Sequence, residues 1–386
     1  MNRRITRRTI APPYLATLAL CLCTIPFTAP AFAQTSSARI AVITVPGAPL
    51  ASFDMSYVDP ATQTYYLTDR SNSAVDIIDA KTNAFVGRVG GFSGPSSSVE
   101  TAGPNGVVVL GKLRQVWASN GDGTVKVIDM ASQPPRIVDS IATGASKRAD
   151  EMEFAAQEGV VLVANDAEEP PFATLISTAP GHKILGQIKF PDATNGLEAP
   201  AWDRVGKRFY LSIPELNHDK AKGAVAEIDP KSKKVINLIE VDKCQPAGLA
   251  FGPRQHLLVG CSQDAIEAGF PPKALIVDVR IRKVVATITE VGGADEVWYN
   301  PKDNRYYLAA RGMPGGAVLG VIDAKTNRWI ANLPTAKNAH SVAANPGNNR
   351  IFVPLTPNPD CPNGCVAIYA GERIKAGKVS SAGTSG

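Results

Sequence analysis

Six polar side chains stand at matching points of a repeated sequence phrase, and their types are those that bind cations or move protons. They are Asp54, Asn105, Asp150, Glu198, Asp295 and His340. A further copy of the phrase has Ala247 at this point. Carboxylate and amide oxygens are the ligands that hard divalent cations prefer, and an imidazole suits general-base chemistry near neutral pH. If the fold gathers these positions, we expect one acidic site.

The phrase around each position predicts a pair of strands. A polar residue is followed by small or apolar residues, a turn and a strongly apolar run, as in DEVWYNPKDNRYYLAA from Asp295. A second phrase follows, with two β-rich runs joined by an Asp-led turn, as in GVIDAKTNRWIANL from Gly320. Both patterns are typical of hairpins. Copies of the second phrase recur every 45 to 51 residues, a period that indicates a propeller or a solenoid.

Seven copies with four strands each predict an all-β fold, a seven-bladed β-propeller with four-stranded antiparallel blades. The last copy has only one strand after its first pair, CVAIYA from Cys365, while the strand ARIAVITV from Ala38 precedes the first copy. We therefore expect the N-terminal strand to join the last blade and close the ring. Because the first strand of a propeller blade lines the channel, the seven matching positions should meet at one mouth.

Crowded carboxylates need a counter-charge, since otherwise their pKa values rise by roughly 1–3 units. A divalent cation, Ca²⁺ or Zn²⁺, is one candidate, and Lys147, Arg148 or Arg311 could serve instead. The same side chains could also simply cap the starts of the strands. Glu151 and Glu296 are adjacent acids, but strand alternation directs neighbouring side chains to opposite sides.

Long connections between the second and third strands of several blades favour a binding site at this same mouth. They begin at Asn165, Pro214, Cys261 and Thr356. The opposite side has tight, repetitive turns. We expect a small-molecule ligand or a periplasmic protein to bind at the loop-decorated face.

Four cysteines follow the N-terminal leader. Cys244 precedes one predicted strand and Cys261 follows the next, so the two lie at neighbouring ends of an antiparallel pair and favour a disulfide. Cys361 and Cys365 flank Pro-Asn-Gly and favour a bridge within one loop, with a metal pair as the competing interpretation.

The N-terminus has the pattern of a secretory signal peptide over residues 1–33, with four arginines, an apolar stretch and Ala-Phe-Ala before Gln34. The stretch is too short to suggest a membrane span. We expect one propeller over residues 34–371, a flexible tail over 372–386, and a periplasmic or secreted monomer. The leader has four basic and no acidic residues, so the net charge of +5 falls to +1 without it. No basic stripe favours nucleic acid.

The repeated IDAKTN turns, the NPxxNRxY turns and the blade period resemble YVTN-type seven-bladed propellers over essentially the whole mature chain. This resemblance implies the fold. It also implies an alternative function, that of a non-catalytic periplasmic propeller binding a ligand or a protein.

The residue types in the channel are also similar, more weakly, to those of gluconolactonase and paraoxonase propellers, in which a channel-bound cation polarises a carbonyl. This similarity implies a divalent-metal-assisted hydrolase of a small lactone or ester. Glu198, Asn105, Asp150 and Asp295 would hold the ion, and His340 or Asp54 would take the proton. No Gly-x-Ser-x-Gly elbow, phosphate-binding loop or haem-attachment motif occurs in the sequence.

Overall fold

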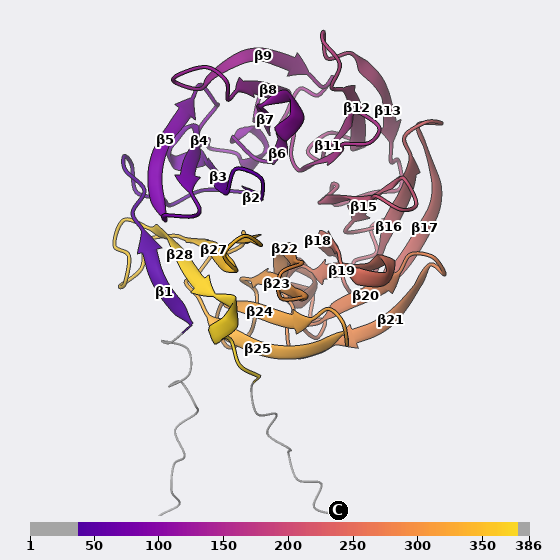
Figure 1. Ribbon diagram of the computed structural model, residues 1–386. Coiled ribbons are helices and arrows are strands. Elements are labelled where there is room, and N and C mark those ends of the chain that lie inside the picture. The colour runs from indigo at the N-terminus through magenta and orange to yellow at the C-terminus, as the bar shows by residue number, and fades with distance from the viewer. Residues whose placement is uncertain (1–37, 377–386) are drawn as a thin grey trace, which may run out of the picture. The chain divides into compact units, whose positions relative to one another are not determined.

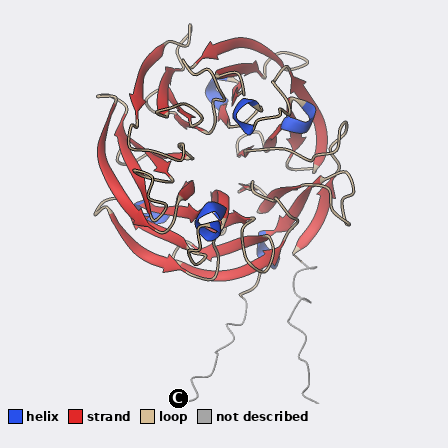
Figure 2. Ribbon diagram, turned by 180° about the vertical axis from the view of Figure 1, so that it is seen from behind, coloured by secondary structure: helices blue, strands red, loops and turns tan. Residues whose placement is uncertain are grey.

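A ring of seven four-stranded antiparallel sheets makes up the described part of the chain (Figure 1). The structure is a computed structural model that describes residues 38–376. Within that range, helix occurs only as short turns between strands (Figure 2). The predicted all-β, seven-bladed propeller is thereby confirmed. The predicted signal peptide lies outside the described residues.

The first strand of each blade stands nearest the centre of the ring, and the second pairs with it. The first strands are β2 (Ser56–Asp59), β6 (Val107–Leu110), β10 (Met152–Ala155), β14 (Pro200–Asp203), β18 (Pro246–Phe251), β22 (Ala294–Asn300) and β26 (Ala343–Asn345). The second strands are β3 (Thr64–Asp69), β7 (Gln115–Ser119), β11 (Val160–Asn165), β15 (Arg208–Ile213), β19 (His256–Cys261), β23 (Arg305–Ala310) and β27 (Arg350–Leu355).

The third and fourth strands complete each blade toward the rim. The third strands are β4 (Ala74–Asp79), β8 (Thr124–Asp129), β12 (Phe172–Ser177), β16 (Lys222–Asp229), β20 (Ala274–Asp278), β24 (Val318–Asp323) and β28 (Cys365–Ala370). The outer strands are β5 (Ala84–Gly90), β9 (Arg136–Ala142), β13 (Ile184–Lys189), β17 (Lys234–Asp242), β21 (Lys283–Ile288), β25 (Arg328–Pro334) and, for the last blade, β1 (Arg39–Ile43).

The burial of each strand follows from its distance to the rim. The second and third strands are buried along nearly their whole length, because both faces of each sheet pack on neighbouring blades. The outer strands alternate instead, as in β17, where Ile236 and Leu238 are exposed and Ile239 and Val241 are buried. The outer strand at the rim is therefore the solvent-exposed edge of each sheet.

Aspartates cap the turns between the third and outer strands, which explains their repetition in the sequence. In the first blade, Asp79 Oδ1 accepts hydrogen bonds from the backbone N–H groups of Lys81 and Thr82, at 2.8 and 3.0 Å. Asn83 then takes a left-handed conformation with φ of 63°. The aspartate of the repeated phrase therefore stabilises a turn and does not mark a functional site.

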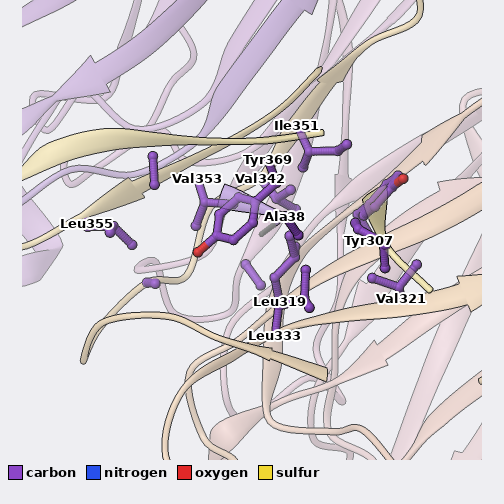
Figure 3. Close-up of a cluster of buried hydrophobic side chains, with 14 of the residues drawn as sticks. Ala38, Tyr307, Leu319, Val321, Leu333, Val342, Ile351, Val353, Leu355 and Tyr369 are labelled. Atoms are coloured by element: carbon purple, nitrogen blue, oxygen red, sulfur yellow. The ribbon is translucent and has the colours of Figure 1, made fainter. Parts of the chain in front are cut away.

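The N-terminal strand closes the ring, as predicted. β1 pairs antiparallel with β28, which gives the last blade the order β1-β28-β27-β26. Ala38 is buried against side chains of the last two blades, including Tyr369 and Leu333 (Figure 3). At the other end, the packed chain extends past the predicted boundary at residue 371, because Ile374 is also part of this core.

Candidate functional site

The predicted polar residues occupy equivalent places in their blades. Four of them donate the same backbone hydrogen bond, from their N–H to a carbonyl near the end of the second strand, at 2.8 to 3.1 Å. The donors are Asp54, Asn105, Asp150 and Glu198. Each side chain therefore begins at the same end of its blade, next to the channel.

One cavity of about 1120 Å³ lies at this mouth. Five of the six predicted polar residues line it: Asp54, Asp150, Glu198, Asp295 and His340. The sixth, Asn105, is fully buried and does not line the cavity. Each of the four long connections also contributes to the lining, through Asp166, His218, Asp264 and Thr356. The expectation that these loops share one mouth with the polar positions is confirmed.

An arginine that was not predicted holds two of these residues. Arg70 is the first residue of the short turn (Arg70–Asn72) that follows β3, and it is buried. Its guanidinium pairs with the carboxylate of Asp54 and donates to Asn105 Oδ1, from Nη2 at 2.7 Å and from Nε at 3.0 Å. The Asn105 amide in turn donates to the carbonyl of Ala149 at 2.8 Å. Asn105 is thus engaged entirely within the protein.

Two further arginines neutralise the next acids around the ring. Arg148 Nη2 lies 2.9 Å from Asp150 and also pairs with Asp166, whose carboxylate accepts from Arg148 Nε at 3.0 Å. Arg311 Nη2 lies 3.0 Å from Asp295. Burial works against the charge of Arg148, but Asp150 and Asp166 raise its pKa. These guanidinium groups supply the counter-charge that the acidic ring requires.

Three glutamates at the same level have no such partner. Within residues 38–376, Glu151, Glu198 and Glu296 form no ion pair, and buried Glu151 Oε2 has no hydrogen-bond donor. Glu151 and Glu296 interact electrostatically, although they belong to the third and sixth blades. Burial raises the pKa of Glu151, and the charges of Glu296 and Glu198 raise it further.

The predicted metal ligands do not form a ligand set as they stand. Asn105, Asp150 and Asp295 are engaged by the arginines, which leaves Glu198 alone among the four. Over residues 38–376, no three His, Cys, Asp or Glu side chains are placed to hold a metal ion together. A bound divalent cation would have to displace guanidinium groups from these oxygens. The Ca²⁺ or Zn²⁺ site stays a prediction.

His340 is held tightly by the backbone. Its Nδ1 lies 2.7 Å from the carbonyl oxygen of Asn338, and its Nε2 lies 3.1 Å from that of Phe53. The imidazole stacks on the Phe53 ring, with centroids 4.6 Å apart. Burial lowers the pKa of His340, opposed by the charges of Asp295 and Asp54. A neutral imidazole donates through only one nitrogen, and here both nitrogens are directed at backbone carbonyl oxygens. The two contacts therefore fix the orientation of the ring, and neither nitrogen is directed into the cavity as a free base. Its catalytic role, like that of Asp54, stays a prediction.

Two aromatic side chains from the first strands of different blades meet further along the chain than the polar positions. Tyr57 in β2 meets Trp298 in β22 edge to face, with ring centroids 5.2 Å apart. These strands belong to the first and sixth blades, which the seventh blade separates in the ring. Neither residue lines the cavity. The polar lining therefore belongs to the loop-decorated end of the channel.

Both predicted disulfides are present, and both are at this decorated end. Cys244 pairs with Cys261, the last residue of β19, and Cys361 pairs with Cys365, the first residue of β28. The Cα atoms of the two pairs lie 4.5 and 5.8 Å apart. No helix within residues 38–376 is long and apolar enough to cross a membrane.

Comparison with known proteins gives the fold alone. No protein-family model and no curated protein sequence matches this chain. Among solved structures, hydrazine synthase from Kuenenia stuttgartiensis is similar with a TM-score of 0.64 and 14% identity, over 84% of this chain and 96% of that one. A chain of a mitotic checkpoint complex is similar with a TM-score of 0.66 and 12% identity, over 92% and 98%. The seven-bladed propeller is thus supported, and membership of the YVTN-type family stays a prediction.

Proposed function

We propose that the protein is an exported propeller that binds a small hydrophilic molecule in the cavity at its loop-decorated mouth. The main support for this proposal is the cavity, which is lined by residues at the beginning of the first strands and by the long loops. A large concave site with convergent polar groups is the usual form of a small-molecule site. The two disulfides agree with export, because such bridges persist in oxidising compartments.

The charge of the lining sets the kind of ligand. Ten carboxylates and four Arg or Lys side chains surround the cavity. Such a lining repels anions and is costly to desolvate for an apolar ligand. The ligand is therefore hydrophilic, with a neutral or positive net charge, and nucleic acid is disfavoured.

Binding is preferred here to the metal-assisted hydrolase predicted from the sequence. Of the four proposed metal ligands, Asn105 accepts a hydrogen bond from an arginine, and Asp150 and Asp295 form ion pairs with arginines. Both nitrogens of the proposed base face backbone carbonyls. The hydrolase stays a prediction that a metal titration of the purified protein would test.

A mouth-blocking substitution tests the proposal. Asn195 lines the cavity and is exposed, so Asn195→Trp places a large ring across the opening without disturbing the core. Thermal-shift measurements with cationic, zwitterionic, neutral and anionic hydrophilic probes should show stabilisation by at least one of the first three. That stabilisation should be lost in Asn195→Trp.

The matched control is Val205→Trp, at an exposed turn on the opposite side of the same blade, after β14. It should bind the probe as the wild type does. If every probe that shifts the wild type also shifts Asn195→Trp equally, the cavity is not the binding site and the proposal fails.

A further inference from the structure

The acids of the cavity fall into two groups with different surroundings. Asp54, Asp150, Asp166 and Asp295 pair with buried or partly buried arginines. Glu151 and Glu198 also line the cavity, yet neither forms an ion pair within the described residues. Burial and neighbouring acids raise the pKa of Glu198, and the charge of Arg148 opposes that rise. Each of these arginines already pairs with an acid of the first group, although the buried Nε of Arg311 has no hydrogen-bond acceptor. Burial raises the pKa of Glu151 and of Glu198, so each acid is neutralised either by its own proton or by a cation from outside the protein.

Glu151 is the more telling of the two residues. The residue is buried, with 5% relative exposure. It lines the cavity, and its buried Oε2 atom has no hydrogen-bond donor. Leaving a buried acceptor unpaired is costly, so a donor at this point is favoured. Glu296 does not line the cavity, but its charge raises the pKa of Glu151. It brings no cation.

From this juxtaposition we propose that Glu151 and Glu198 form the subsite for a primary ammonium group of the ligand. An alkylammonium carries three N–H donors and one positive charge, and charge-assisted hydrogen bonds to carboxylates are the stronger kind. A hard divalent cation needs six to eight oxygens instead, and no cluster of three suitable side chains is present over residues 38–376. The inference rests on the proposed function and names the ligand class for the same cavity.

Calorimetric titration of the full-length protein with 1,4-diaminobutane tests the subsite, with 1,4-butanediol as the uncharged probe of similar length. The diamine should bind and the diol should not. Glu151→Gln and Glu198→Gln each remove one charged acceptor while keeping the side-chain shape. Each should weaken diamine binding by about tenfold or more.

Glu169→Gln is the matched control, because Glu169 is an exposed acid of the same lining. It changes the charge of the cavity by the same amount and should weaken binding by less than about threefold, since exposed charges are screened. Melting curves of all three variants verify that they fold.

The inference is overturned if diamine binds Glu151→Gln and Glu198→Gln as tightly as Glu169→Gln, or if the diol binds equally well. A failure of the subsite is distinct from a failure of the proposed function. If the diamine does not bind but another hydrophilic probe does, and Asn195→Trp abolishes that binding, only the ammonium assignment is wrong. If Asn195→Trp affects no probe, both are wrong.

Discussion

At the scale of single residues, one arginine lies beside two acids at two separate places in the molecule. In the cavity wall, Arg148 lies between Asp150 and Asp166, so one cation serves two acids. In the first blade, Asp69 and Asp76 are both fully buried beside Arg88, whose Nε donates to Asp76 Oδ1 at 2.9 Å. Removing one member of such a group leaves charge uncompensated in a low-dielectric interior.

Arg148→Met should therefore destabilise the protein by about 3–5 kcal/mol, because the buried carboxylate of Asp150 and the half-buried one of Asp166 lose their cation. Chemical denaturation monitored by tryptophan fluorescence measures this loss. The double variant Arg148→Met/Asp150→Asn should recover part of it, since one unpaired acid is removed. Equal stability of wild type and Arg148→Met would show that this ion-pair group contributes nothing.

The acid pair of the first blade predicts a pH dependence. Burial and then the charge of Asp69 raise the pKa of Asp76 to about 8, against the opposing effect of Arg88. Between pH 3.8, its ordinary pKa, and about 8, the folded state binds this proton more tightly than the unfolded chain does. Stability from this group is thus full at low pH and falls as pH rises, by at most about 1.4 kcal/mol per pH unit.

Asp76→Asn removes that titration while keeping an oxygen for Arg88 and adding a donor toward Asp69. Relative to wild type, the variant should gain stability between pH 5 and pH 8, measured by urea denaturation at both values. A difference between variant and wild type that is the same at pH 5 and pH 8 would contradict this account.

At the scale of elements, the strand pattern was predictable and the side-chain pairing across the ring was not. The hairpin phrases define each blade because turn residues and strand periodicity are local properties of the sequence. The unpaired strand from Ala38 predicted that β1 closes the ring. Arg70 was missed as a partner of Asp54, although its position after a second strand placed it at the decorated mouth.

Strand alternation gave the wrong side for one of two acids. It directed Glu151 and Glu296 away from the matching positions, yet Glu151 lines the cavity, whereas Glu296 does not line it and acts on Glu151 through its charge. Glu151 precedes the regular strand, since β10 begins at Met152. The pairing of β22 is irregular between Ala294 and Val297, around Glu296. Strand alternation holds only where the ladder is regular.

The closing strand β1 gives a prediction at this scale. Ile43 is buried in the core between the last and first blades, whereas its neighbour Val42 is 46% exposed. Ile43→Ala should lower the free energy of unfolding by about 2–5 kcal/mol, and Val42→Ala by about 0.5 kcal/mol or less. Denaturation curves of the two variants compare them directly. Equal effects would mean that β1 does not pack as a structural strand.

At the scale of the whole molecule, the circular arrangement creates a charge density that composition does not reveal. The chain has 40 basic and 35 acidic residues, yet ten carboxylates and four basic side chains line one cavity. Residues far apart in the sequence meet there because every blade starts at the same mouth. The ion-paired arginines stabilise this arrangement, and the remaining unpaired acids give the cavity its preference for positive ligands.

The electrostatic potential of the cavity is the most direct test of this account. Asn195→Cys places a thiol in the lining, and Val205→Cys places one on the opposite side of the same blade. Peptide mapping would follow the modification of each thiol by a cationic and an anionic methanethiosulfonate reagent. The cationic-to-anionic rate ratio should be on the order of tenfold higher at residue 195 than at residue 205, and high salt should reduce it. Equal ratios at the two sites would contradict the claim that the ring forms an electronegative ligand-binding cavity.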